Sequence, residues 1–181
     1  IAKKHGPVAL VHVDAHADVN DEMFGERETH GTVFRRAYEE GLLVPELVFQ
    51  VGLRGTGYTA EDFTEAASWG FNMTTAPEIW HKSLTPLGND IRQAIGEHPC
   101  YLTYDIDSLD PAYAPGTGTP EIGGLTTPQA MEFIRALRGL NIIGFDMVEV
   151  SPMYDTSGNT ALTAANLIFE ILSILPGVKF R

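Results

Sequence analysis

The feature that most constrains this chain is an apolar run that ends in alternating metal-ligand residues. Residues 7–13 read Pro-Val-Ala-Leu-Val-His-Val, and Asp14, His16 and Asp18 follow at intervals of two. In extended backbone such positions point to one face, so a buried strand ending here would aim all three side chains at one place. Unpaired buried carboxylates are costly, and a metal ion removes that cost. The stretch predicts a core strand with a metal site at its end, and we expect His12 to be strand core.

A second stretch repeats the pattern. Residues 101–104, Tyr-Leu-Thr-Tyr, lead into Asp105 and Asp107, which again lie two apart. The two predicted strand ends together offer four carboxylates and one imidazole, a donor set that suits Mn²⁺ better than Zn²⁺ or copper. Because four carboxylates over-neutralise one divalent ion, we expect two metal ions about 3.5–4 Å apart.

These motifs resemble those of a known family. Residues 14–18, Asp-Ala-His-Ala-Asp, resemble the first metal motif of the ureohydrolases, which include arginase, agmatinase and guanidinobutyrase. Residues 104–120 resemble the second metal motif and its following loop, and residues 148–152, Val-Glu-Val-Ser-Pro, resemble the third signature. The resemblance covers nearly the whole chain and is closest to the agmatinase and guanidinobutyrase branch.

The resemblance implies a role for each metal-ligand position. Asp14 and Asp105 would bridge two Mn²⁺ ions, His16 and Asp107 would hold one ion, and Asp18 would hold the other. A guanidinium carbon is a poor electrophile because resonance spreads its charge over three nitrogens. Its hydrolysis at neutral pH therefore needs a strong nucleophile, and a hydroxide bridging the two metal ions would supply one.

Three further residues take their predicted roles from the same resemblance. Glu149 would bind the guanidinium through charge-assisted hydrogen bonds, and His30 would carry protons to the departing amine. Asn20 matches a position that contacts the substrate carboxylate in arginases, which favours a guanidino acid over agmatine. The neighbouring acids Asp21, Glu22 and Glu26 would instead suit a cationic tail, so the sequence leaves the substrate open.

The order of patterns along the chain predicts one α/β domain. Apolar runs typical of strands lie at residues 7–13, 47–51, 70–74, 100–104 and 141–147, and helical patterns lie at 32–43, 59–68, 86–95, 128–137 and 160–175. Such alternation predicts a three-layer α/β/α fold with a mainly parallel sheet, which is arginase-like by resemblance. We expect residues 1–181 to form a single ureohydrolase domain.

The start of the chain indicates an N-terminally truncated piece. The chain has no initiating Met and enters almost directly into the first predicted strand. It also lacks a GGDH-type motif, whose His completes one metal site in the family. We therefore expect residues 1–181 to be the C-terminal portion of a longer enzyme.

Charge and cysteine content limit the partners. A net charge of −12 argues against nucleic acid and anionic membranes as partners. The single Cys100 fits a reducing compartment, and residues 1–5 do not resemble a signal peptide, so we expect a cytoplasmic protein. Family members commonly form trimers or hexamers, so the resemblance implies a homo-oligomer.

The predicted function is that of a Mn²⁺-dependent ureohydrolase of the agmatinase type. It would split a small guanidino substrate, agmatine or 4-guanidinobutyrate, into urea and the corresponding amine. A formimidoyl or guanidinopropionate hydrolase is an alternative within the enzyme class. A non-catalytic ureohydrolase-like subunit is the alternative outside it, although such a subunit would not need the five metal-ligand residues.

Overall fold

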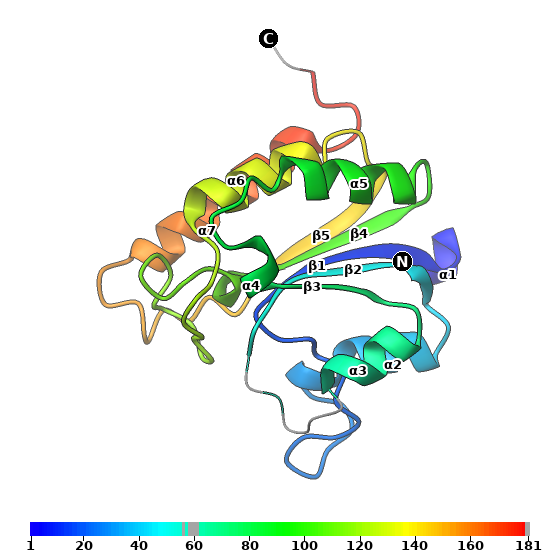
Figure 1. Ribbon diagram of the computed structural model, residues 1–181, viewed down its shortest axis with the longest axis horizontal. Helices are drawn as coiled ribbons and strands as arrows, with labels where there is room; N and C mark the ends of the chain where they lie inside the picture. The colour runs from blue at the N-terminus through cyan, green and yellow to red at the C-terminus, as the bar shows by residue number, and fades with distance from the viewer. Residues whose placement is uncertain (56, 58–61, 180–181) are drawn as a thin grey trace.

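The computed structural model describes residues 1–55, 57 and 62–179, and these form one parallel sheet flanked by helices (Figure 1). The strands are β1 (Val8–Val13), β2 (Leu43–Leu53), β3 (Asn72–Thr75), β4 (Cys100–Asp105) and β5 (Ile142–Val148). Their order in the sheet is β3-β2-β1-β4-β5, and every pairing is parallel. The predicted parallel α/β fold is confirmed.

Helices cover both faces of the sheet, as a three-layer fold requires. Figure 1 shows α5, α6 and α7 on one face and α2 and α3 on the other. The helices are α1 (Ala2–His5), α2 (Val33–Glu39), α3 (Asp62–Ser68), α4 (Ala76–Ile79), α5 (Thr85–Ile95), α6 (Thr127–Ala136) and α7 (Asn159–Ile174), with the 3₁₀ turns η1 (His30–Thr32) and η2 (Ile106–Ser108). Within the described ranges, no helix combines the length and apolar character that a bilayer crossing requires.

The central strand β1 is buried along its whole length because both of its faces are covered. Ala9, Val11 and Val13 join the core beneath α5, α6 and α7, whereas Val8 and Leu10 join the core on the opposite face. Burial on both faces explains why the strand reads as a continuous apolar run rather than an alternating one. His12 falls on the same face as Val8 and Leu10.

The order of the strands places a switch point beside β1. The chain runs outward from β1 through β2 to β3, and then returns to the other side of β1 with β4 and β5. In open α/β sheets, ligands bind at the carboxyl ends of the strands at such a point. The ends of β1 and β4 carry the two predicted metal motifs, so the topology brings these motifs together.

The predicted element boundaries differ from the structure chiefly around α2 and β2. The strand expected at 47–51 begins already at Leu43, and the helix expected to reach residue 43 ends at Glu39. Pro45 obscured the start of β2 because a proline cannot donate to a ladder; it lies where the register with β1 shifts. Gly41, with φ +65°, reverses the chain after α2. The helix start expected at Thr59 lies outside the described residues, and α1 and α4 were not expected.

Candidate metal centre

One cavity of about 620 Å³ opens at the carboxyl ends of β1 and β4. Every site residue predicted from the sequence lines it, although those residues come from segments more than a hundred positions apart. These residues are Asp14, His16, Asp18, Asn20, His30, Asp105, Asp107 and Glu149. The structure thus places all eight around one space large enough for a small molecule.

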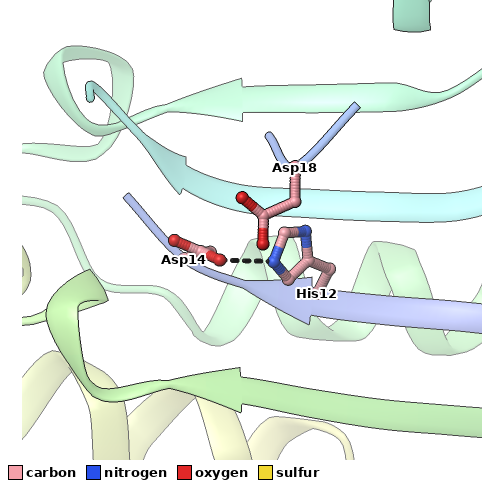
Figure 2. Close-up of side chains that lie close together, drawn as sticks. All are labelled: His12, Asp14 and Asp18. Atoms are coloured by element: carbon pink, nitrogen blue, oxygen red, sulfur yellow. Dashed lines mark hydrogen bonds and ion pairs between the residues drawn. The ribbon is translucent and has the colours of Figure 1, made fainter. Parts of the chain in front are cut away.

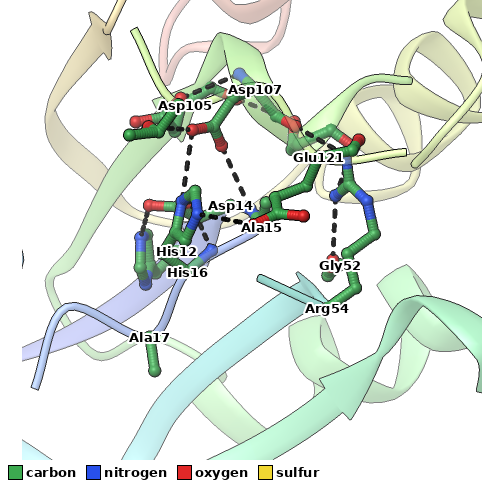
Figure 3. Close-up of polar contacts among 12 residues, drawn as sticks. His12, Asp14, Ala15, His16, Ala17, Gly52, Arg54, Asp105, Asp107 and Glu121 are labelled. Carbon is green, nitrogen blue, oxygen red and sulfur yellow. Dashed lines mark hydrogen bonds and ion pairs between the residues drawn. The ribbon is translucent and has the colours of Figure 1, made fainter. Parts of the chain in front are cut away.

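The first half of the centre joins the ends of β1 and β4 (Figure 3). Nδ1 of His16 lies 3.2 Å from Oδ2 of Asp107 and 3.4 Å from Oδ1 of Asp14. The backbone N–H of Ala15 donates to Oδ1 of Asp107 at 3.3 Å, which links the two strand ends directly. One ligand atom from each of Asp14, His16 and Asp107 lies within 4.8 Å of the others, so the three side chains could hold one metal ion.

The second half of the centre contains His12, which the sequence predicted only as a core residue of the first strand. His12 is buried in β1 as expected, but its Nε2 lies 2.7 Å from Oδ2 of Asp14. Figure 2 shows the carboxylate of Asp18 facing this pair, and ligand atoms of the three residues lie within 4.8 Å of one another. His12 continues the interval of two backward from Asp14, a signal that could have marked it as part of the site.

Asp105 lies beside these two groups rather than inside either of them. It ends β4, and its Oδ1 accepts the backbone N–H of Asp107 at 2.8 Å. Among the described residues, neither group of three close metal-ligand side chains includes Asp105. It nevertheless lines the same cavity and is buried, so its role as a metal ligand stays a prediction.

The electrostatics of the cluster favour a bound cation. Burial and the nearby Asp14 carboxylate raise the pKa of Asp18 to about 7, and burial with Asp14 and Asp107 raises that of Asp105 to about 11. Burial lowers the pKa of His16, but its hydrogen bonds to Asp107 and Asp14 outweigh that effect and raise it to about 10. Crowded buried carboxylates hold protons to limit their repulsion, and divalent cations would relieve it. The residues therefore fit a divalent cation.

Arg54, which directly follows β2, joins the end of that strand to residues 107–109 and 121–122 (Figure 3). Its guanidinium donates to backbone carbonyl oxygens at 2.6–3.2 Å, and these belong to Gly52, Asp107, Ser108, Leu109, Glu121 and Ile122. Glu121 in turn places Oε1 3.8 Å from Nε2 of His16. Spacing along the sequence gives Arg54 no predicted role, because its partners lie up to 68 positions away.

The three predicted substrate residues, Asn20, His30 and Glu149, line the same cavity as the metal-ligand residues. Glu149 directly follows β5 and has φ +61°, a left-handed conformation that a non-glycine residue rarely adopts. Asp18 has φ +53°. His30 begins η1 and is exposed, and the backbone N–H of Asn20 donates to the carbonyl of Gly31 at 3.1 Å. Left-handed non-glycine residues cluster at functional sites, which is consistent with a site at this end of the sheet.

The fold and the cavity define a class of protein. They are those of an open parallel α/β domain of three layers, with an acidic ligand site where the carboxyl ends of its strands meet. The family model described as "Arginase family" matches residues 1–173, so the chain belongs to the arginase family.

Individual relatives place the chain within that family. It is 64% identical over 181 residues to a guanidinobutyrase of Pseudomonas aeruginosa, covering 100% of this chain and 57% of the relative. It is 57% identical over 179 residues to a mitochondrial agmatinase of Gallus gallus, covering 99% and 53%. These relatives agree with the predicted agmatinase and guanidinobutyrase branch. The chain spans a little more than half the length of each.

A solved structure supports the fold assignment. The structure of proclavaminate amidino hydrolase from Streptomyces clavuligerus is similar to this chain with a TM-score of 0.89 at 40% identity. The likeness covers 94% of this chain and 57% of that one. The arginase-like fold expected from the motifs is therefore confirmed.

Proposed function

We propose that the protein hydrolyses a linear guanidino compound to urea and the corresponding amine. The observation that carries this proposal is the gathering of the metal-motif carboxylates and Glu149 around one cavity. Asp14, His16, Asp18, Asp105 and Asp107 would hold two Mn²⁺ ions. When bound, these ions would supply the Lewis acidity that activates a water molecule toward the guanidinium carbon.

The side chains around the metal centre would bind and orient the substrate. Glu149 would accept paired hydrogen bonds from the guanidinium, which holds its carbon facing the carboxylate cluster. His30 would carry a proton to the departing amine, since an imidazole can both accept and donate protons near neutral pH. The acidic cavity and the net charge of −12 would attract a guanidinium cation.

A guanidino acid such as 4-guanidinobutyrate is the proposed substrate, with agmatine as the compound to compare. Asn20 lines the cavity and can donate its amide N–H to a carboxylate. Asp21 instead accepts from Nη2 of Arg36 at 2.7 Å, and neither it nor Glu22 or Glu26 lines the cavity. These three acids therefore do not line the cavity that a cationic tail would enter. The name of the 64% identical guanidinobutyrase agrees with this choice.

Urea release by the full-length, Mn²⁺-loaded protein tests the proposal. We expect faster release from 4-guanidinobutyrate than from agmatine or 3-guanidinopropionate. The exposed variant Asp90→Asn on α5 is a control that should behave as wild type. No urea from any of them with two metal ions bound per chain would direct attention to a formimidoyl substrate. No urea and no bound metal would favour a non-catalytic subunit.

Two predictions from the resemblance concern the whole protein. We propose a homo-oligomer, a trimer or hexamer, which light scattering would measure. We also propose a cytoplasmic location, which fractionation of cells would check.

A further inference from the structure

A buried pair of side chains lies directly behind the candidate metal centre. His12 on β1 and Gln50 on β2 are register partners in the parallel sheet, and both are fully buried. Phe34 packs on the imidazole with ring centroids 4.2 Å apart. Fully buried polar side chains are costly unless hydrogen-bonded, so their contacts should be informative.

The orientation of the Gln50 amide follows from its contacts. Nε2 lies 2.7 Å from the carbonyl oxygen of Ala17, and a carbonyl oxygen can only accept. Reversing the amide would set two acceptor oxygens at that distance, so the NH₂ group must face Ala17. Its second hydrogen is then directed at Nδ1 of His12, 2.9 Å away. Among the described residues, Oε1 of Gln50 has no hydrogen-bond partner, which fits an amide held by its nitrogen.

The Gln50 amide in turn determines which nitrogen of His12 carries the proton. A neutral imidazole has one N–H and one acceptor nitrogen. Because Nδ1 accepts from Gln50, Nε2 must carry the hydrogen, and it lies 2.7 Å from Oδ2 of Asp14. A nitrogen that bears a hydrogen has no free lone pair for a metal ion. His12 is therefore a donor to Asp14 rather than a metal ligand, although it lies close enough to be counted as one.

Asp14 is consequently held at both of its oxygens. Oδ2 accepts from His12, and Oδ1 accepts the backbone N–H of His16 at 2.7 Å. We infer that Gln50 and His12 are positioning residues, in which Gln50 sets the tautomer of His12 and His12 holds Asp14 in the orientation that metal binding needs. This inference rests on the proposed metal site, because Asp14 belongs to both groups of close metal-ligand side chains.

Nuclear magnetic resonance tests the first step. Full-length, metal-free protein labelled with [¹⁵N]histidine should show His12 as the Nε2–H tautomer in long-range ¹H–¹⁵N spectra. The His12 signals are assigned by their loss in His12→Gln. Gln50→Leu removes the donor to Nδ1, so the population of the Nε2–H tautomer should fall. An Nδ1–H tautomer or a doubly protonated ring in the wild type would overturn the inference.

Mn²⁺ titration tests the second step with two matched variants. His12→Leu removes the donor to Asp14 and should weaken Mn²⁺ binding about 10- to 100-fold, the usual cost of losing a group that orients a ligand. His12→Gln keeps an amide N–H in place of Nε2–H and should recover most of the affinity. His98→Leu, at a half-buried histidine that contacts the carbonyl oxygen of Pro7 and does not line the cavity, is the control.

The possible outcomes separate the roles of His12. Equal losses in His12→Leu and His12→Gln would overturn the inference by making His12 a direct ligand. A lower melting temperature with unchanged affinity in both variants would also overturn it, because His12 would then serve packing alone. If the wild type binds no Mn²⁺, the proposed function fails and the role given to His12 in metal binding is overturned with it. The wild-type NMR tautomer then still supports or overturns the assignment of the Gln50 contact to His12.

Discussion

Mn²⁺ binding should expel protons from this protein, because the metal-free site holds protons that the metal must displace. Metal ligands bind in their deprotonated forms, so ligands with raised pKa values release protons on loading. Crowding and burial raise the pKa of Asp105 to about 11 and that of Asp18 to about 7. The contacts of His16 with Asp107 and Asp14 raise its pKa to about 10.

The size of the release follows from these values. At pH 7, Asp105 and His16 each hold close to one proton and Asp18 holds half of one, so loading releases roughly two and a half protons. Of these three groups, Asp18 is the one that titrates near neutral pH. Its share falls from about 0.9 proton at pH 6 to about 0.1 at pH 8.

Isothermal titration calorimetry in buffers of different ionisation enthalpy measures this release. The slope of the observed enthalpy against the buffer enthalpy is the number of protons released. Asp18→Asn should lower the release at pH 7 by about half a proton and remove its change between pH 6 and pH 8. Asp90→Asn on α5 should leave both unchanged. Release of fewer than one proton by the wild type at pH 7 would refute the reasoning.

Three further predictions concern stability and activity. The metal-free fold should lose stability as pH rises from 4 to 9, because Asp18, Asp105 and His16 keep protons that the unfolded chain releases in that range. A melting temperature that rises between pH 4 and pH 9 would contradict this prediction. Glu149→Gln should lower kcat/KM about 100-fold, or about 3 kcal/mol, while metal analysis should find the same amount of bound Mn²⁺ as in the wild type. Near-normal kinetics would exclude the proposed contact of Glu149 with the guanidinium. Arg54→Lys should lower the free energy of unfolding, measured by urea denaturation, by about 2 kcal/mol, because an ammonium group has fewer donors than the guanidinium. A change no larger than that of the exposed control Arg27→Lys would refute this prediction.

The parts of the site that the sequence predicted are those built by local spacing. Asp105 and Asp107 lie two positions apart at the end of a continuous apolar run, so their shared location needs only a strand and its end. The same holds for Asp14, His16 and Asp18 after β1. The alternation of strands and helices then predicted a parallel sheet whose carboxyl ends meet. The cavity gathers these residues as that logic expects, while their roles as metal ligands stay predictions.

The parts that the sequence could not supply depend on long-range partners or on local irregularity. The early start of β2 was hidden by Pro45, which cannot donate to a ladder and lies where the register with β1 shifts. Arg54 reads as a loop residue until the fold brings six backbone carbonyls to its guanidinium. In both cases the decisive fact is where another segment lies.

The sequence by itself determined the chemical character of this protein: an acidic, imidazole-containing cavity at the strand ends of an arginase-family α/β domain. The tertiary structure decided how that chemistry is held in place. His12 is a core strand residue by pattern, and Gln50 lies 38 positions away from it. Only the parallel pairing of β1 with β2 sets their side chains in contact, and that contact directs the N–H of His12 toward Asp14. Hydrogen-bond direction depends on distances of a few ångströms, which chain order does not encode.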